Sequence, residues 1–327
     1  MGSERGWQYR YAAPLGDDGL EAMASEIELI ERIRRRAFPA LPAGVVVGIG
    51  DDCALFRPRG AAEDLLFTTD LLVEGTHYLR ATHTAEDVGW KTLARGLSDI
   101  AAMGGAPRFC LVSLALAPWQ TAQWVDGFYR GLLRLARREA TPLVGGDLGH
   151  GPSAVADIVV CGAVPRGSAL LRGGARAGDA IYVSGRLGGS ALGLARGKRG
   201  GAAWKRHARP EPRLKLGRFL RQRVGATAAM DLSDGLSLDL RRLCLESRVQ
   251  AEIQAPPRYP GASLEQALHG GEDYELLFTA GPRARVPAKA AGVPLTRIGT
   301  VLHGRPGVVT LEGTPLPPLG YDHLRNP

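Results

Sequence analysis

Short runs of apolar residues recur along this chain of 327 residues, separated by longer stretches in which apolar side chains repeat every three or four positions. The short runs predict buried strands, and the longer stretches predict amphipathic helices. In the first half the expected strands span residues 45–48, 65–69, 109–117, 143–145 and 154–164. In the second half they span residues 180–184, 275–279 and 295–301. Such alternation along the whole chain predicts an α/β fold with α+β layers.

Capping residues mark where the helices begin. Ser25 stands three positions before Glu28, a capping-box spacing that predicts a helix start at this point. A second helix is expected over residues 84–103, with Thr84 as its N-cap. Further helices are expected over residues 121–140 and 188–196.

The length of the chain predicts two domains, because a single hydrophobic core rarely organises so many residues. The glycine-rich segment 165–179 is the best boundary. We therefore expect an N-terminal extension over residues 1–22, an N-terminal domain over 23–165 and a C-terminal α/β domain over 166–327.

Aspartate follows an apolar run at four places in the chain. The four motifs are Gly50-Asp51-Asp52, Thr68-Thr69-Asp70, Gly145-Gly146-Asp147 and Asp231-Leu232-Ser233-Asp234-Gly235. A carboxylate at a strand end projects into the crevice where open α/β sheets bind ligands. Oxygen ligands without paired His or Cys suit Mg²⁺. One such motif would fit an ordinary turn, but four together favour a magnesium site.

Asp99 lies late in the second predicted helix, directly after Ser98. Taken alone, it is expected to form a helical ion pair with Arg95, four positions earlier.

Familiar nucleotide-binding signatures are missing. Residues 193–199 lack the first glycine and the final Ser or Thr of a phosphate loop, and residues 48–50 lack the third glycine of a dinucleotide fingerprint. The chain also has no nucleophile elbow and no protein-kinase catalytic loop. Any bound ATP would therefore be held through carboxylates bridged by metal ions.

Composition narrows the class of protein. The chain is 45% apolar and 23% charged, with a net charge of +8 that we assign to solvated, arginine-rich helix faces. Basic and aromatic residues do not interleave, so nucleic acid is not an expected partner. No apolar run is long enough to span a membrane. Four scattered cysteines without metal or redox spacing indicate the reducing cytoplasm.

Six motifs occur in the order seen in the thiamine-monophosphate kinase family, which the chain resembles from residue 25 to residue 323. They are Gly48-Ile49-Gly50-Asp51-Asp52-Cys53-Ala54, Thr68-Thr69-Asp70 followed by Gly75-Thr76-His77, Leu97-Ser98-Asp99, Gly145-Gly146-Asp147, Met230-Asp231-Leu232-Ser233-Asp234-Gly235 and Gly270-Gly271-Glu272-Asp273-Tyr274-Glu275.

The resemblance implies the two-domain fold of the aminoimidazole ribonucleotide synthetase-like superfamily. In it the N-terminal sheets of two subunits pair into a homodimer, and ATP binds near that junction in the N-terminal domain. The implied magnesium ligands are Asp52, Thr68, Thr69, Asp70, Asp99, Asp147, Asp231 and Asp234. The implied ATP contacts are Tyr129, Gly146, Asp147, Arg172 and Ser233. The implied contacts to thiamine monophosphate are His77, Glu272 and Tyr321.

The implied reaction is phosphorylation of thiamine monophosphate by ATP, giving thiamine diphosphate. Because the attacking phosphate oxygen is already ionised near neutral pH, no side chain is expected to act as a catalytic base. Within the superfamily the alternatives are synthetases of aminoimidazole ribonucleotide or selenophosphate, the latter requiring a reactive cysteine, for which Cys53 is the nearest candidate. A hydrogenase-maturation enzyme would end in cysteine, whereas this chain ends in Pro327. From another class, a non-catalytic basic binding module would bind DNA in a salt-dependent manner.

Overall fold

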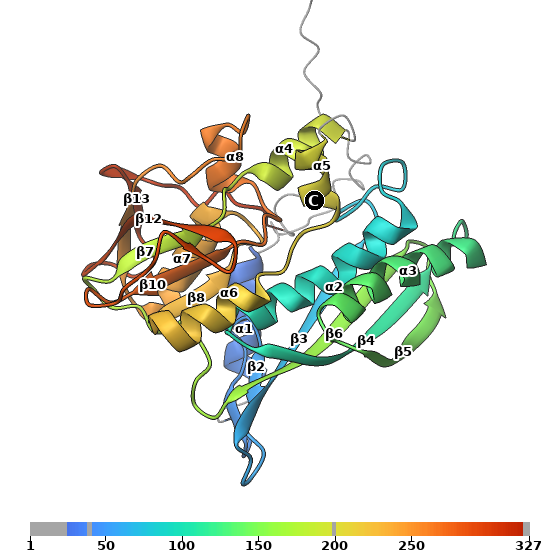
Figure 1. The fold of residues 1–327 in the computed structure, drawn as a ribbon, viewed down its shortest axis with the longest axis horizontal. Helices are drawn as coiled ribbons and strands as arrows, with labels where there is room; N and C mark the ends of the chain where they lie inside the picture. The colour runs from blue at the N-terminus through green and yellow to red at the C-terminus, as the bar shows by residue number, and fades with distance from the viewer. Residues whose placement is uncertain (1–24, 38–40, 198–200, 323–327) are drawn as a thin grey trace, which may run out of the picture.

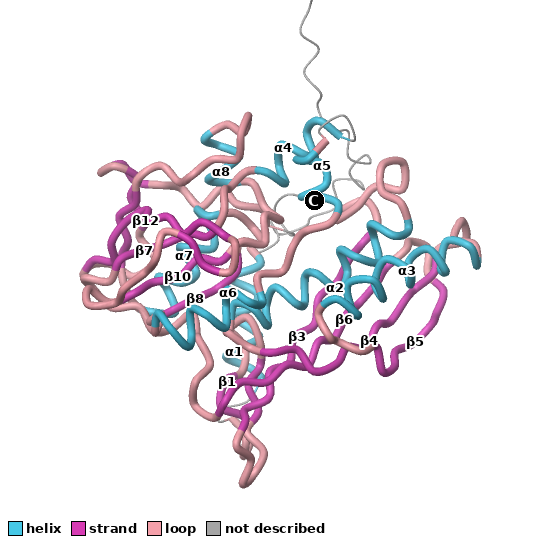
Figure 2. Tube along the Cα trace, in the orientation of Figure 1, coloured by secondary structure: helices cyan, strands magenta, loops and turns pink. Residues whose placement is uncertain are grey.

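Two mixed β-sheets with helices between and around them form the molecule (Figures 1 and 2). The structure is a computed structural model that describes residues 25–37, 41–197 and 201–322. The extension predicted over residues 1–22 lies outside the described residues.

The first sheet has six strands in the order β1-β2-β3-β6-β4-β5. Its neighbours pair antiparallel except β4 and β5, which are parallel and are connected through helix α3. Helices α2 and α3 lie side by side on one face of this sheet (Figure 1). The bounds are β1 Val45–Val47, β2 Ala54–Phe56, β3 Glu63–Val73, α2 Ala85–Ala102, β4 Ala106–Leu116, α3 Ala122–Arg138, β5 Leu143–His150 and β6 Val155–Pro165.

The second sheet has the strand order β14-β13-β9-β12-β7-β10-β8, with β11 added beside β12. Its strands are β7 Ala180–Ser184, β8 Ala228–Asp231, β9 Gln250–Ile253, β10 Leu276–Ala280, β11 Lys289–Ala290, β12 Val293–Leu302, β13 Val309–Leu311 and β14 Thr314–Pro315. The remaining helices are α1 Glu26–Ala37, α4 Gly189–Arg196, α5 Ala202–Ala208, α6 Leu214–Phe219, the π-helical turn η2 Leu220–Val224, α7 Leu236–Ser247 and α8 Leu264–His269.

Helix α2 joins the two halves of the molecule. It packs on β3 and β6 of the first sheet, and it also contacts α6 and β8 of the second half. One hydrophobic core therefore contains residues of both halves, such as Leu97 of α2 and Leu216 of α6. The approach is close: a Cβ at Gly217 of α6 would lie 1.8 Å from the Ala101 carbonyl oxygen. Because α2 is covered on both sides, polar side chains such as Lys91 and Ser98 are buried between the domains.

The predicted caps at Thr84 and Ser25 are confirmed. Thr84 accepts a hydrogen bond from the Asp87 amide within a capping box. Thr121, where the third helix is expected to begin, likewise accepts one from the Trp124 amide. At the first helix the Glu28 carboxylate accepts a hydrogen bond from the Ser25 amide at 2.8 Å. These contacts span only three residues, which explains why the sequence alone locates them.

Two strands run further than predicted. Strand β3 continues to Val73 and strand β5 to His150, so Asp70 and Asp147 lie inside strands rather than beyond their ends. The expectation that every aspartate motif follows a strand end is wrong at these two places. The reason is the ladder: β6 pairs with the whole of β3, and β4 pairs with β5 through His150.

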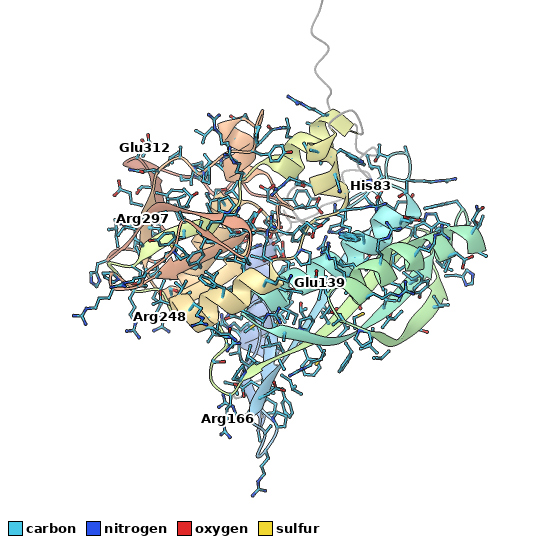
Figure 3. All side chains as sticks on the ribbon, in the orientation of Figure 1. His83, Glu139, Arg166, Arg248, Arg297 and Glu312 are labelled. Atoms are coloured by element: carbon cyan, nitrogen blue, oxygen red, sulfur yellow. The ribbon has the colours of Figure 1, made fainter. Side chains whose placement is uncertain are left out.

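Arginines project from separate parts of the surface, including Arg166, Arg248 and Arg297 (Figure 3). Several others pair with glutamates, as Arg138 does with Glu211 at 2.7 Å. Within the described part of the chain, no helix combines the length and the apolar character that crossing a membrane requires.

Candidate active site

A cavity of about 550 Å³ lies between the two halves of the molecule. It is bordered by strand β3, helices α1, α2 and α4, and the loops that follow β8 and α8. Many of the residues predicted from the sequence meet here. They are Asp52, Thr68, Thr69, Asp70, His77, Asp99, Arg172, Asp231, Ser233, Asp234, Glu272 and Tyr321.

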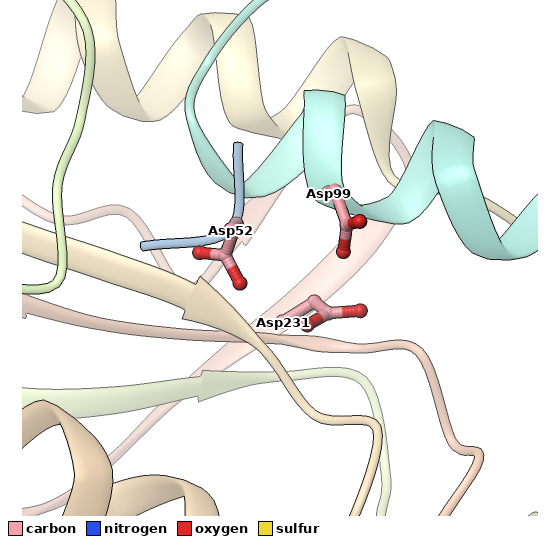
Figure 4. Close-up of side chains that lie close together, drawn as sticks. All are labelled: Asp52, Asp99 and Asp231. Carbon is pink, nitrogen blue, oxygen red and sulfur yellow. The ribbon is translucent and has the colours of Figure 1, made fainter. Parts of the chain in front are cut away.

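Three aspartates from different elements converge at one end of the cavity (Figure 4). Asp52 comes from the turn between β1 and β2, Asp99 from α2, and Asp231 from the last position of β8. One carboxylate oxygen of each lies within 4.8 Å of the others. Because two of these elements belong to the first half of the chain and β8 to the second, the cluster forms only when the halves pack together.

Neighbouring groups fix each carboxylate of this cluster. Ser98 donates from its hydroxyl to Asp231 Oδ2 at 2.6 Å, and the Thr68 hydroxyl donates to Asp99. Arg172 donates to Asp52 Oδ1. Hydroxyl and guanidinium donors on one oxygen of each acid leave its other oxygen for a further partner.

The electrostatics of the cluster favour a cation. Burial raises the pKa of Asp99 well above its usual range, and Asp70, Asp231 and Asp52 raise it further. Burial and then the Asp52 charge raise the pKa of Asp231 in the same direction. Among the described residues Asp52 Oδ2 is buried without a hydrogen-bond partner. Since like charges this close disfavour ionisation of one another, the three carboxylates fit a metal ion that would neutralise them.

Alternation along β3 divides the predicted ligands between two faces of the sheet. Thr68 points toward α2, where it meets Asp99, and Asp70 on the same side accepts a hydrogen bond from Arg95 at 3.0 Å. Thr69 borders the cavity, but its hydroxyl donates to Asp157 on β6 at 2.7 Å. The expected helical pair between Arg95 and Asp99 is therefore wrong, because Asp70 offers Arg95 a carboxylate across the helix–sheet interface.

One arginine binds two aspartates of the second half. Arg242 of α7 donates to Asp234 and, at 3.2 Å, to Asp239. The buried Asp239 carboxylate accepts the backbone N–H groups of Asp234 and Gly235, which holds the loop after β8 in place. Burial and the Asp234 charge raise the pKa of Asp239 to about 7.

A second polar cluster lies at the other end of the cavity, around Glu272. Lys91 of α2 donates to Glu272 Oε2 at 2.8 Å, and His207 Nδ1 lies 3.2 Å from the same oxygen. Burial alone would raise the pKa of Glu272, but Lys91, His207 and Arg95 hold it well below its usual range. Glu272 is thus an ionised carboxylate with its charge already compensated.

Comparison with known proteins agrees with this geometry. The family described as AIR synthase related protein, N-terminal domain, matches residues 50–164, and the corresponding C-terminal domain matches residues 176–312. Thiamine-monophosphate kinase of Rhodopirellula baltica is 37% identical, covering 85% of this chain and 92% of the relative. That of Escherichia coli is 39% identical, covering 86% and 93%.

The chain belongs to the thiamine-monophosphate kinase family. The predicted resemblance and the two-domain fold with two mixed sheets are thereby confirmed. A solved structure, AaThiL complexed with AMPPCP and TMP, is similar with a TM-score of 0.81 and 33% identity, covering 91% of this chain and 97% of that one.

Three residues that the family resemblance implies as ATP contacts lie apart from the cavity. Tyr129 is on α3, where its ring contacts Phe128 edge to face, and Gly146 and Asp147 are on β5. None of the three borders the cavity among the described residues. Asp147 pairs in register with Ser113, which is opposite Asp157, which in turn is opposite Leu71. Asp147 therefore lies on the face of the first sheet that α2 and α3 leave open.

Two residues of the cavity's Glu272 cluster, Lys91 and His207, were not predicted as site residues from the sequence. A signal for Lys91 is present: Lys91, Arg95 and Asp99 recur every four residues and form a charged stripe on a helix whose other charged residues are confined to its first turn. His207 carries no comparable signal, since α5 approaches the site only through the packing of the second half.

Proposed function

We propose that this enzyme transfers the γ-phosphoryl group of ATP to thiamine monophosphate and releases thiamine diphosphate and ADP. The observation that carries the proposal is the convergence of Asp52, Asp99 and Asp231 in an interdomain cavity of a chain belonging to this family. A carboxylate cluster without a nucleophile or base is the equipment that transfer between two phosphates requires.

The chemistry needs charge neutralisation rather than proton abstraction. The acceptor phosphate is largely ionised at neutral pH, since its second pKa is about 6. Magnesium ions, when bound, neutralise the phosphates and hold them in line. Asp52, Asp99 and Asp231 would hold them, with further ligands from Thr68, Thr69, Asp70 and Asp234 around the same cavity. Arg172 and Ser233 would contact ATP from the cavity wall. The roles of Tyr129, Gly146 and Asp147, which lie apart from this cavity, stay predictions from the family resemblance.

The opposite end of the cavity suits the thiamine part of the substrate, bordered by His77, Glu272 and Tyr321. The Lys91 ammonium group already balances the charge of Glu272, and His207 adds a contact at 3.2 Å. We therefore assign Glu272 the role of accepting a hydrogen bond from the aminopyrimidine, in preference to compensating the thiazolium charge. Its side chain bonds to α2 and α5 rather than to its own loop, which argues against a mere loop cap.

We also propose a homodimer formed through the open face of the first sheet. Phe67 and Leu71 lie four residues apart on β3 and share that face, with 37% and 55% of their surface exposed. A second copy would cover them and bring Asp147 of one subunit toward the junction, where the family is expected to bind ATP. Light scattering should give a dimer mass for the protein and a monomer mass for Leu71→Glu. Ile33→Glu, an exposed position on α1, is the control that should stay dimeric.

The alternative synthetases are less well supported. Cys53 is 2% exposed, and burial together with Asp99, Asp52 and Asp51 raises the pKa of its thiol well above the usual range. Such a thiol is a poor nucleophile, which argues against the selenophosphate reaction.

The four cysteines are free and buried, in keeping with a proposed cytoplasmic location. We place the domain boundary after residue 165, because the strands of the two sheets lie on either side of it.

A product assay tests the proposal. Purified protein incubated with ATP, Mg²⁺ and thiamine monophosphate should form thiamine diphosphate and ADP in equal amounts. Consumption of ATP only with formylglycinamidine ribonucleotide or only with selenide would instead favour one of the synthetases.

A further inference from the structure

Lys91 is a fully buried lysine in the middle of α2, with 0% of its side chain exposed. A lysine is almost never buried to this extent unless its charge is paired, because desolvating an ammonium group is costly. Its position between the two sheets therefore points to a specific task.

The Lys91 ammonium group connects two residues that border the thiamine end of the cavity. It donates to Glu272 Oε2 at 2.8 Å and to the backbone carbonyl oxygen of His77, also at 2.8 Å. His77 lies in the turn between β3 and α2, whereas Glu272 lies between α8 and β10 in the other half of the chain. One cation thus holds the two walls of the cavity together.

The loop that carries Glu272 is held in an unfavourable conformation. Glu272 has φ of 63° and Tyr274 has φ of 48°, in the left-handed region that residues with a Cβ rarely adopt. The Glu272 amide donates to the Ser233 carbonyl oxygen at 2.7 Å, which ties this loop to the loop after β8. Strain of this kind persists only where surrounding contacts impose it, and it gathers at functional sites.

The two oxygens of Glu272 have different surroundings. Oε2 is occupied by Lys91 and His207, whereas Oε1 is buried with no hydrogen-bond partner among the described residues. Arg95 approaches Oε1 only to 4.0 Å. With Oε2 fixed, the carboxylate cannot rotate freely, so Oε1 keeps one direction as an acceptor.

We propose that Lys91 is a positioning residue for substrate recognition, holding Glu272 Oε1 and the His77 turn in the geometry that accepts the thiamine part of the substrate. The assignment rests on the proposed function, since it concerns the thiamine end of the same cavity. Lys91 itself need not touch the substrate.

A double-mutant cycle separates positioning from simple stabilisation. The variants are Lys91→Met, which keeps the length of the side chain without its charge, Glu272→Gln, and the two combined. Lys205→Met, an exposed position on α5, is the matched control. For each protein kcat, the KM of both substrates and the melting temperature are measured.

Lys91→Met should raise the KM for thiamine monophosphate at least about tenfold, the effect of losing a charge-assisted hydrogen bond. The KM for ATP should stay within about threefold, because the contacts to ATP lie elsewhere. In the Glu272→Gln background the same change should raise the KM for thiamine monophosphate less than about threefold, since the carboxylate to be positioned is gone.

A lower melting temperature with both KM values unchanged in Lys91→Met would show that Lys91 only stabilises the fold. If that variant does not fold, Lys91→Gln decides, because it removes the charge but keeps a hydrogen-bond donor near Glu272. A KM for thiamine monophosphate raised at least about tenfold, with the KM for ATP within about threefold, supports positioning, and two unchanged KM values overturn it. No turnover by the wild-type protein would overturn the proposed function, whereas wild-type turnover with a normal KM in Lys91→Met overturns this assignment alone.

Discussion

Replacing Asp99 by Asn should make the metal-free protein more stable while removing its activity. The three carboxylates of Asp52, Asp99 and Asp231 have oxygens within 4.8 Å of one another. Two unit charges at that distance repel by about 3.5 kcal/mol when the effective dielectric constant is about 20. Asp99 takes part in two of these pairs, so its neutralisation removes the repulsion of both.

The net gain is smaller than the sum of the two pairs. Burial and the neighbouring charges raise the pKa of both Asp99 and Asp231, so protonation already relieves part of the repulsion. We expect a gain of about 2 to 4 kcal/mol, seen as a rise in melting temperature of about 4 °C or more. Asn has nearly the same shape, and its carbonyl oxygen can still accept from the Thr68 hydroxyl.

The assay is thermal unfolding in EDTA and in Mg²⁺, with turnover measured on the same samples. Wild-type protein should gain stability from Mg²⁺ and Asp99→Asn should gain less, since a ligand that binds the folded state stabilises it. Turnover of the variant should fall at least about 100-fold. Asp126→Asn, at an exposed position of α3, is the control and should change neither quantity. A variant less stable than wild type in EDTA would refute the electrostatic reasoning, because Asp99 would then support folding.

Four further outcomes are expected. EDTA should abolish turnover and Mg²⁺ should restore it, so full activity in EDTA would count against a metal role. Asp147→Asn should lose at least about 100-fold in turnover with an unchanged melting curve, because its side chain is exposed on β5; near-normal activity would remove it from the metal site. Glu272→Gln should raise the KM for thiamine monophosphate while the KM for ATP stays within about threefold, and unchanged KM values with a lower melting temperature would assign it to folding. Metal-free wild-type protein should gain more stability than Asp51→Asn as the pH falls from 8 to 6, because burial raises the pKa of Asp51 to about 7 and folding then takes up a proton there, whereas the lowered pKa values of buried His83 and His207 affect both proteins equally; an equal change in the two proteins would contradict this.

The sequence alone determined the features that depend on near neighbours. The caps at Ser25 and Thr84 follow from side chains that bond to amides three residues away. Apolar runs located the longer strands, since burial in a sheet requires them whatever their partners are, but not short strands such as β9. The aspartate motifs predicted a magnesium site, because Mg²⁺ bound to phosphates prefers oxygen ligands.

Sequence pattern failed where a neighbouring strand or helix decides the outcome. The ends of β3 and β5 depend on how far β6 and β4 continue alongside them. Asp70 and Asp147 therefore lie inside strands that the sequence pattern predicts to end before them. Arg95 pairs with Asp70 rather than with Asp99 on its own helix, because the sheet brings the Asp70 carboxylate within hydrogen-bond distance.

Only the tertiary structure decided which side chains share the cavity. Ser98 bonds to Asp231 across 133 positions of the chain, and Lys91 bonds to Glu272 across 181. No local pattern encodes these pairs, because they exist only where α2 lies between the two sheets. The sequence therefore indicated which residue types could bind metal and substrate, whereas only the fold determined which of them pair. The reason is that Coulomb and hydrogen-bond energies depend on distances that packing alone sets.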